Sequence, residues 1–358
     1  MRSPFITIIC ILISYSATRA QADVNFVNEF LNIGVGARAH GMFGSVSATT
    51  DDVTAAYWNP AGLTGGKQAL EVSAMHASWF GGISNYDYIG AAKAIGTDGN
   101  SRAALTFIRM GIDNIPNTLN LIGPDGSVNY DEVTEFSAAD YALMFSYAKK
   151  LNQKGLSMGA NVKVIRRSLG SFGQAWGFGF DLGAVWKKEN FSLSIMGRDI
   201  STTVNAWSFD FTEEEKQVFA QTGNVIPVSS TEIALPKLII GAAVHGGKGS
   251  FSYLLEGDIR FSTDGTQSGV LSGESIGIDP TVGLEIGFNK QAFIRAGIGN
   301  IQRIVNQVNT SETRLSTQPN VGVGIALGRL KIDYALANLG STADVLVSHI
   351  FSLTVGFE

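Results

Sequence analysis

The sequence has few cysteines, prolines and charged residues. Cys10 is the only cysteine, prolines number 8 of 358 residues, and charged residues make up 16% of the chain, against roughly a quarter in soluble domains. The lack of cysteine excludes a disulfide-stapled domain and a cysteine-ligated metal site. Beyond residue 22, no apolar stretch approaches the roughly 20 residues that a membrane-spanning helix needs. The chain is nevertheless 45% hydrophobic and has 42 glycines, which leaves a soluble β protein or a membrane-embedded β-barrel.

The first 22 residues have the pattern of a secretion signal. Arg2 precedes a short apolar run, 5–15, and Ala20-Gln21-Ala22 supplies small residues at the positions that a signal peptidase reads. We expect cleavage after Ala22, with cleavage after Ala20 as the alternative. Cys10 lies inside the apolar run, which continues past it, so we reject a lipoprotein signal and expect a mature chain without cysteine.

Apolar side chains recur with a period of two along the expected mature chain. Successive side chains of a β-strand point to opposite faces, so each such segment has one apolar face and one small or polar face. The clearest example has Trp176, Phe178, Phe180, Leu182, Ala184 and Trp186 alternating with Ala175, Gly177, Gly179, Asp181 and Gly183. The pattern recurs at 251–258, 282–288, 321–328 and 330–337. A charge facing lipid at the bilayer centre costs roughly 2–4 kcal/mol, so this separation of faces indicates a lipid-facing wall.

The fold class that we expect is all-β, a transmembrane antiparallel β-barrel of about 14 strands. Tight turns alternate with longer connections at 111–134, 199–235, 261–276, 300–317 and 338–346. Outer-membrane barrels have short periplasmic turns and long extracellular loops, so we expect both termini in the periplasm and the protein in the cell outer membrane. The expected strands begin near Gln68, Asn85, Ser101, Glu135, Gly155, Gly173, Asn190, Pro236, Ser250, Ile278, Gln291, Gln318, Arg329 and Val347.

The segment before the first expected strand, 25–66, has little strand character. It contains a glycine-rich stretch, an acidic pair and the run Asn59-Pro60-Ala61-Gly62. A barrel of this size would otherwise leave an open channel, so we expect the segment to fold into the lumen as a hatch. The expected division is a signal peptide (1–22), an N-terminal hatch (23–66) and a transmembrane barrel (67–358).

Several motifs resemble those of FadL-type outer-membrane proteins, which are 14-stranded barrels plugged by such a hatch. The fuller runs 34–42, 57–63, 137–142 and 159–163 are more similar to the PorV/PorQ-like branch of this superfamily. The resemblance covers essentially the whole expected mature chain. The hatch motif comprises Gly34, Gly36, Arg38, Gly41, Asp51, Asp52, Trp58, Asn59, Pro60, Ala61 and Gly62.

The resemblance implies a role in type IX secretion, the protein export route of Bacteroidetes-type bacteria. PorV-like barrels lie beside the translocon and receive the C-terminal domains of exported cargo. Our first hypothesis is therefore a secretion accessory with those proteins as partners. The alternative is a FadL-like channel for the uptake of hydrophobic small molecules, with a hydrophobic ligand. A third hypothesis is an outer-membrane enzyme that acts on lipid A. Each of them places the protein among outer-membrane lipids.

Charged residues on the inward faces of the expected strands are candidate site residues. They either line a transport path or pair with one another and with the hatch, as a polar lumen requires; we expect pairing. These residues are Lys163, Asp181, Glu256, Asp258, Glu285, Lys331 and Asp333.

The longest expected outer loop, 199–235, contains a helix signal and four aromatic residues. Thr212 and Glu215 form a capping box, which predicts a short helix through Ala220. Exposed apolar patches often mark binding sites. The candidate partner or ligand loop therefore presents Trp207, Phe209, Phe211 and Phe219.

We expect no catalytic residue, metal or cofactor. Gly34-x-Gly36-x-x-Ala39 formally fits a dinucleotide-binding fingerprint, but the strand and helix that the motif requires are missing around it. None of the four histidines pairs with another at metal-ligand spacing. A Ser/His/Asp site assembles in space, so the sequence leaves that alternative open. The net charge of −5 gives no reason to expect nucleic acid as a partner.

Overall fold

The computed structural model describes residues 27–96, 99–121, 127–151, 154–263, 271–272, 276–305, 313–338 and 347–358. The expected signal peptide, 1–22, and the first residues of the expected hatch lie outside this part of the chain. No helix among the described residues is both long and apolar enough to cross a membrane.

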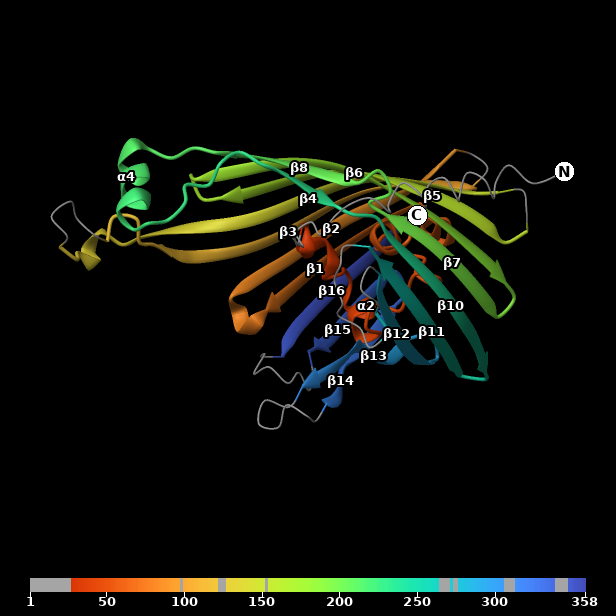
Figure 1. The fold of residues 1–358 in the computed structure, drawn as a ribbon. Helices are drawn as coiled ribbons and strands as arrows, with labels where there is room; N and C mark the ends of the chain where they lie inside the picture. The colour runs from red at the N-terminus through yellow and green to blue at the C-terminus, as the bar shows by residue number, and fades with distance from the viewer. Residues whose placement is uncertain are drawn as a thin grey trace.

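Fourteen antiparallel strands close into a barrel, as the sequence predicted (Figure 1). The last strand pairs with the first, from Leu70 opposite Phe357 to Ser78 opposite His349. The barrel strands are β1 (Leu70–Trp79), β2 (Ser84–Ile95), β3 (Ser101–Asn117), β4 (Thr134–Lys150), β5 (Leu156–Leu169), β6 (Gly173–Lys188), β7 (Phe191–Arg198), β10 (Lys237–Lys248), β11 (Phe251–Ser262), β12 (Gly277–Phe288), β13 (Ala292–Val305), β14 (Thr313–Leu327), β15 (Leu330–Ala337) and β16 (Ser348–Phe357).

Two further strands extend the wall beyond the barrel on the long-loop side. Past the end of β7, β8 (Thr203–Phe209) pairs with the outer half of β6, and β9 (Thr231–Ala234) pairs with β8. Helix α4 (Glu213–Gln221) connects β8 to β9 and begins at Thr212 with the predicted capping box. Together with the ends of β3 and β4, these elements form an arm that projects from one side of the barrel in Figure 1.

The strands on the long-loop side are longer than the sequence predicted. β3 and β4 continue to pair as far as Asn117 opposite Thr134, past an irregularity between Ile112 and Ile115. The sequence predicted a long connection over 111–134, but Gly111 and the asparagines after it, which favour turns, do not end the pairing. Likewise, β14 begins at Thr313 rather than near Gln318, which shortens the expected 300–317 connection. Two connections on this side are short, at 80–83 and 170–172, so the alternation of loop lengths is incomplete.

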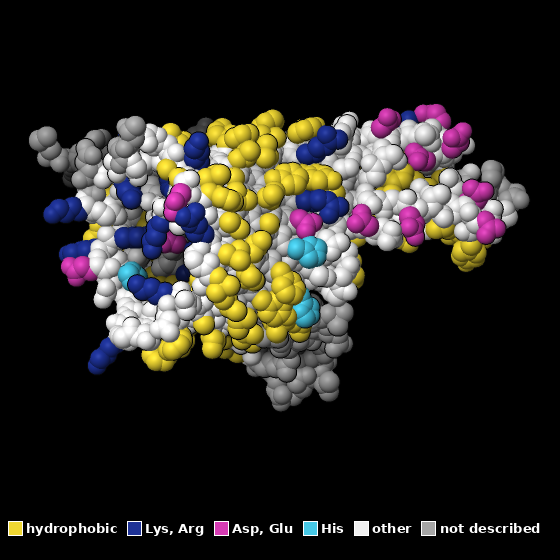
Figure 2. All heavy atoms as spheres, turned by 180° about the vertical axis from the view of Figure 1, so that it is seen from behind, with side chains coloured by type: hydrophobic (Ala, Val, Ile, Leu, Met, Phe, Trp, Pro, Cys, Tyr) yellow, Lys and Arg dark blue, Asp and Glu magenta, His cyan; other side chains and the backbone are white. Residues whose placement is uncertain are grey.

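The outward side chains form an apolar belt around the barrel. On β6, Trp176, Phe178 and Phe180 point outward and are 46%, 59% and 45% exposed, whereas the residues between them face inward. Figure 2 shows the belt as a continuous band of hydrophobic side chains. Such exposure of large apolar side chains is stable in lipid and would be costly in water. The outward face of the wall therefore matches a transmembrane barrel.

Residues 27–66, the hatch, fill the inside of the barrel (Figure 1). The hatch contains four short helical turns, η1 (Glu29–Asn32), α2 (Ala37–Gly41), α3 (Ala55–Trp58) and η2 (Pro60–Gly65). Two more 3-10 turns, η3 (Phe80–Gly82) and η4 (Tyr130–Glu132), belong to the connections on the long-loop side. The protein core lies between hatch and wall, where apolar hatch residues pack against inward residues such as Ile108 and Ile165.

Candidate functional site

The Asn59-Pro60 turn of the hatch docks on β5 and β6. The Asn59 side-chain oxygen accepts a hydrogen bond from the backbone N–H of Ala61 at 3.1 Å and so caps η2, while Pro60 fills its first helical position. This arrangement is favourable because Pro lacks the N–H that a helix start leaves unpaired. The Asn59 side-chain amide donates to the backbone oxygens of Ala184 and Ile195 at 3.2 and 3.4 Å. One residue thus shapes the turn and ties it to the wall.

Inward-facing glycines form sockets in the wall for this turn. A Cβ atom on Gly183 would come within 2.1 Å of the Asn59 side-chain oxygen, and one on Gly159 within 2.5 Å of the Ala61 nitrogen. Similarly, a Cβ on Gly297 would lie 2.2 Å from the carbonyl carbon of Met42. These sockets were not predicted from the sequence. The available signal was the recurrence of glycine on the inward face of successive strands.

The glycine-rich part of the hatch motif packs around Trp58. The Trp58 indole N–H donates to the Val35 oxygen at 2.8 Å, and its ring fills the space where a Cβ of Gly34 would lie. Gly34 also has a φ of +102°, which side-chain-bearing residues rarely adopt. Gly41 approaches the Gly322 backbone of β14. These residues serve the packing of the hatch, and no strand–helix unit of a dinucleotide site surrounds them.

The acidic pair, Asp51 and Asp52, lies in the hatch shortly before α3. The Asp52 carboxylate accepts from the backbone N–H of Thr54 at 2.9 Å, whereas Asp51 packs against Gly65. Next to them, Glu71 of β1 accepts from the backbone N–H of Val53 at 2.7 Å. Carboxylates therefore satisfy backbone donors that the short hatch helices leave open.

Two of the expected inward charges, Lys163 and Asp181, lie in one buried cluster. Lys163 of β5 is 2% exposed and contacts Asp181 at 2.7 Å and Asp199 at 2.5 Å. The Asp181 carboxylate also accepts from the backbone N–H of Asp199 at 2.9 Å. The neighbouring Arg198 donates to the backbone oxygen of Tyr57 at 3.1 Å and to that of Leu31 at 3.2 Å. This cluster holds the bend between β7 and β8 against the hatch.

A second charged cluster connects the hatch to β12–β15. Arg295 contacts Glu285 and Asp333, each at 2.6 Å, and Glu285 also contacts Arg38 of the hatch at 3.0 Å. Lys331 faces inward at the short-turn end and is exposed. Glu285 therefore pairs with both a wall residue and a hatch residue.

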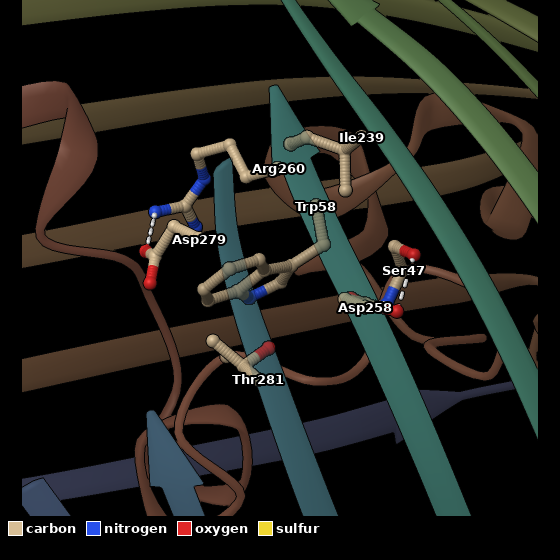
Figure 3. A pocket seen from close by; sticks show the side chains of 8 residues that line it. Ser47, Trp58, Ile239, Asp258, Arg260, Asp279 and Thr281 are labelled. Atoms are coloured by element: carbon tan, nitrogen blue, oxygen red, sulfur yellow. Dashed lines mark hydrogen bonds and ion pairs between the residues drawn. The ribbon is translucent and has the colours of Figure 1, made fainter. Parts of the chain in front are cut away.

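Glu256 and Asp258 of β11 bind the hatch backbone directly. Asp258 accepts from the backbone N–H groups of Val46 and Ser47 at 3.2 and 3.1 Å, and Glu256 accepts from that of Ala48 at 2.6 Å. Beside them, Figure 3 shows Trp58 of the hatch facing residues of β11 and β12 across a small cavity. Its volume is about 10 Å³, roughly the space of one water molecule. The hatch therefore fits closely against this side of the wall.

Of the four histidines, only His40 lies in the hatch. Its ring is buried, and its Nε2 hydrogen-bonds the Gly34 oxygen at 3.1 Å. Burial lowers the pKa of His40 to about 4, although the hydrogen bond to Gly34 opposes the shift. The ring is therefore neutral at pH 7. His76 and His349 face outward, and His245 lies on β10. The described residues contain no group of three or more His, Cys, Asp or Glu side chains that could hold a metal ion.

The four aromatic residues of the expected loop come together with two that the sequence analysis missed. They form the aromatic cluster: Phe136, Phe172, Trp207, Phe209, Phe211 and Phe219. Trp207 stacks on Phe209 with ring centres 5.4 Å apart, and Phe209 on Phe211 at 6.3 Å. Phe172 stacks on Phe211 at 5.9 Å. The remaining members, Phe136 and Phe219, make edge contacts with Phe172 and Phe211.

The aromatic cluster lies on the inner face of the arm. Asn205 of β8 hydrogen-bonds Asn28 of the hatch at 2.8 Å and therefore points inward. Trp207 and Phe209 follow at intervals of two residues and share this face. Arg167 lies over the Trp207 ring at 5.1 Å and pairs with Asp140 at 2.8 Å. The mouth of the barrel on the long-loop side thus has an aromatic surface with a charged rim, and the start of the hatch lies beside it.

No family model and no curated protein matches the sequence, but solved structures match the fold. The Pseudomonas putida toluene transporter TodX superposes with a TM-score of 0.58 at 13% identity, over 91% of this chain and 99% of that one. The CymD monoaromatic hydrocarbon channel gives 0.56 at 13% identity, over 91% and 98%. A Pseudomonas aeruginosa FadL homologue gives 0.55 at 13% identity, over 90% and 98%. At such identities the likeness establishes the FadL-type fold; it does not identify the PorV/PorQ-like branch.

Proposed function

We propose that this protein is an outer-membrane channel for hydrophobic small molecules. The observation that carries the proposal is the aromatic cluster on the inner face of the arm. Aromatic side chains bind apolar molecules through a large contact area and lose little conformational freedom in doing so. The structural neighbours include the CymD monoaromatic hydrocarbon channel and the toluene transporter TodX. Their likeness supports the hydrophobic-channel hypothesis better than the secretion hypothesis.

The proposed path runs from the aromatic cluster to an apolar seam between hatch and wall. Asn28, which bonds β8 below the cluster, is followed by buried Phe30 and Leu31. These two residues belong to the same apolar core as Tyr86 and Ile108 of the wall. A hydrophobic solute that leaves the cluster therefore meets apolar side chains first, on the side of the hatch away from the carboxylates of β11.

The hatch acts as the gate in this proposal. Among the described residues, its hydrogen bonds to the wall involve side chains, and no backbone-to-backbone bond joins hatch and wall. Water can replace such bonds at a limited net cost, since an exchanged hydrogen bond contributes about 0.5–1.5 kcal/mol, or about 1.5–3 kcal/mol when one partner is charged. The wall, by contrast, is a continuous ladder of backbone bonds. The short-turn end, where Gly66 and Glu358 lie, faces the periplasm in the orientation of known outer-membrane barrels.

Variants of the aromatic cluster test the proposal in intact cells, because toluene crosses a phospholipid bilayer without a channel. We expect Trp207→Ala combined with Phe211→Ala to slow the uptake of toluene by cells at low toluene concentration. Val204→Ala is the matched control, because Val204 lies on the same strand and faces outward with 43% exposure. Equal uptake by the cluster variant, the control and the unaltered protein would remove the cluster from the path.

The type IX secretion role stays a prediction from the sequence motifs, because the comparisons support neither translocon nor cargo as a partner. Deletion of 209–219 in cells separates the two functions. The channel proposal predicts a folded barrel, normal secretion and slower uptake of a hydrophobic nutrient. Failure of exported proteins to reach the cell surface, with normal uptake, would instead favour the secretion accessory.

A further inference from the structure

A row of polar side chains crosses the outer surface of six neighbouring strands. Strand register places Trp176 opposite Arg166, Arg166 opposite Tyr141, and Tyr141 opposite Arg109. The row continues with Asp87 and His76 on β2 and β1. Figure 2 shows Lys or Arg, acidic and His side chains along the edge of the hydrophobic band that faces the arm. The row thus marks the edge of the apolar belt on the long-loop side.

A groove of about 430 Å³ lies between this row and the belt. Its apolar residues, Phe107, Leu143 and Val164, continue the lipid-facing surface of β3–β5, and Phe107 stacks on Tyr141 with ring centres 6.0 Å apart. At the other end are Arg166 and Ser168, which face outward two residues apart on β5. The groove therefore joins an apolar part, formed by Phe107, Leu143 and Val164, to a cationic end.

Arg166 lacks an anionic partner within the described part of the chain. Its guanidinium lies over the Trp176 ring at 5.2 Å, and no ion pair joins it to a described carboxylate. Arg109 is two strands away and shares Asp87 with His76, at 3.6 and 2.7 Å. The row therefore has an excess of positive charge at the level where lipid headgroups begin. A guanidinium binds phosphate through two parallel hydrogen bonds, and stacking on Trp176 holds it in place for this purpose.

We propose that this groove binds one phosphate-bearing lipid of the leaflet on the long-loop side. The acyl chain lies along Phe107, Leu143 and Val164, and the phosphate accepts hydrogen bonds from Arg166 and Ser168. Charge complementarity favours a phosphate lipid over a neutral one, and continuity with the belt favours a lipid over a soluble anion. The site is on the outer surface of β3–β6 and does not depend on the proposed channel function.

The test compares two lipids that differ only in the phosphate. The purified full-length protein in mild detergent is offered dipalmitoyl phosphatidic acid or dipalmitoylglycerol, and retention is measured by native mass spectrometry. We expect retention of one phosphatidic acid and at least a roughly tenfold loss of affinity in Arg166→Gln, the size of a charge-assisted hydrogen bond. Lys149→Gln is the matched control, because Lys149 faces outward on β4 at the opposite edge of the belt.

A second variant keeps the test decisive if Arg166→Gln does not fold. Val164→Trp fills the apolar end of the groove without changing any charge, and we expect it to lose phosphatidic acid as well. Equal retention by Arg166→Gln and the unaltered protein would overturn the proposal. Equal retention of dipalmitoylglycerol, or an equal loss in Lys149→Gln, would also overturn it, because binding would then depend on the belt or on overall charge.

Discussion

The side-chain amide of Asn59 lies directly over the backbone of Gly183, where a Cβ atom would come within 2.1 Å of the Asn59 oxygen. The same amide donates to the oxygen of Ala184, the next residue along β6. The wall is thus recessed at the position where the hatch turn needs both space and a hydrogen-bond acceptor. This relationship joins a motif residue to a strand position 124 residues away, and it makes the docking of the hatch directly testable.

We expect Gly183→Ala to displace the hatch turn and leave the barrel closed. The added methyl group overlaps Asn59, and overpacking of this kind costs about 1–3 kcal/mol. The variant should lose thermal stability and leak small solutes from proteoliposomes. Gly257→Ala is the control, because its nearest neighbour would be an ordinary 3.7 Å away. Unchanged leakage in Gly183→Ala, with the alanine incorporated and the barrel folded, would contradict the docking described above.

Replacement of Asn59 and Pro60 by alanine should also raise permeability to small solutes. The double variant loses the cap of η2 and both hydrogen bonds to the wall. Combined with Gly183→Ala, it should show less than additive leakage, because residues in contact share their interaction energy. Strict additivity, or no leakage from the Asn59/Pro60 variant in liposomes, would mean that the motif does not secure the hatch.

Much of the barrel was predictable because strand faces and turns are local properties. The alternation around Trp176 identified the lipid-facing side of β6, and the expected strand starts at Ser101 and Gly173 coincide with those of β3 and β6. The extension of β3 past Gly111 was not predictable. There the local residues favour a turn, with Asn114 at a φ of +59°, and pairing with β4 continues despite them.

The candidate site was predictable only where its parts are close in sequence. The capping box at Thr212 correctly located α4, and the loop analysis found Trp207 and Phe211. Phe136 and Phe172 were missed because Phe136 lies near the start of β4 and Phe172 directly precedes β6. Only the pairing of β4, β5 and β6 brings them to the cluster. The hatch sockets were missed for the same reason: alternation indicates which face a glycine is on but not which hatch residue it meets.

Loss of Lys163 should destabilise the barrel at the bend between β7 and β8. Lys163→Met leaves Asp181 and Asp199 buried without their cation, and a buried ion pair broken on one side costs about 3–5 kcal/mol. The measurement is the temperature above which the protein no longer runs at the position of the folded barrel on an SDS–polyacrylamide gel. The triple variant with Asp181→Asn and Asp199→Asn should recover part of this loss. If the triple variant is no more stable than Lys163→Met, the cluster does not act through charge balance.

The contribution of His40 to the docking of the hatch should weaken as the pH falls from about 6.5 to 4. Burial lowers the pKa of His40 to about 4, so a released hatch binds a proton in this range and a docked hatch does not. The docking equilibrium then shifts by as much as roughly tenfold per pH unit toward the released state. The ratio of leakage at pH 5 to leakage at pH 7 should be higher in the unaltered protein than in His40→Gln, since glutamine does not titrate. An identical pH profile in both proteins would assign the effect to other groups.

The central claim is that hydrophobic solutes cross the barrel when the hatch is displaced. A disulfide that fixes the hatch to the barrel wall tests this claim most directly. Ser47 of the hatch and Ser194 of β7 have side-chain oxygens 2.7 Å apart, so Ser47→Cys with Ser194→Cys places two thiols in contact, and we expect them to form a disulfide of roughly 2.05 Å on oxidation. Ser73→Cys with Thr354→Cys is the matched control, because those oxygens are 2.8 Å apart and both residues belong to the wall. Toluene uptake by intact cells should fall to that of cells lacking the protein when the hatch pair is oxidised and return on reduction, and the wall pair should have no effect. Equal flux through the oxidised and reduced hatch pair would contradict the account.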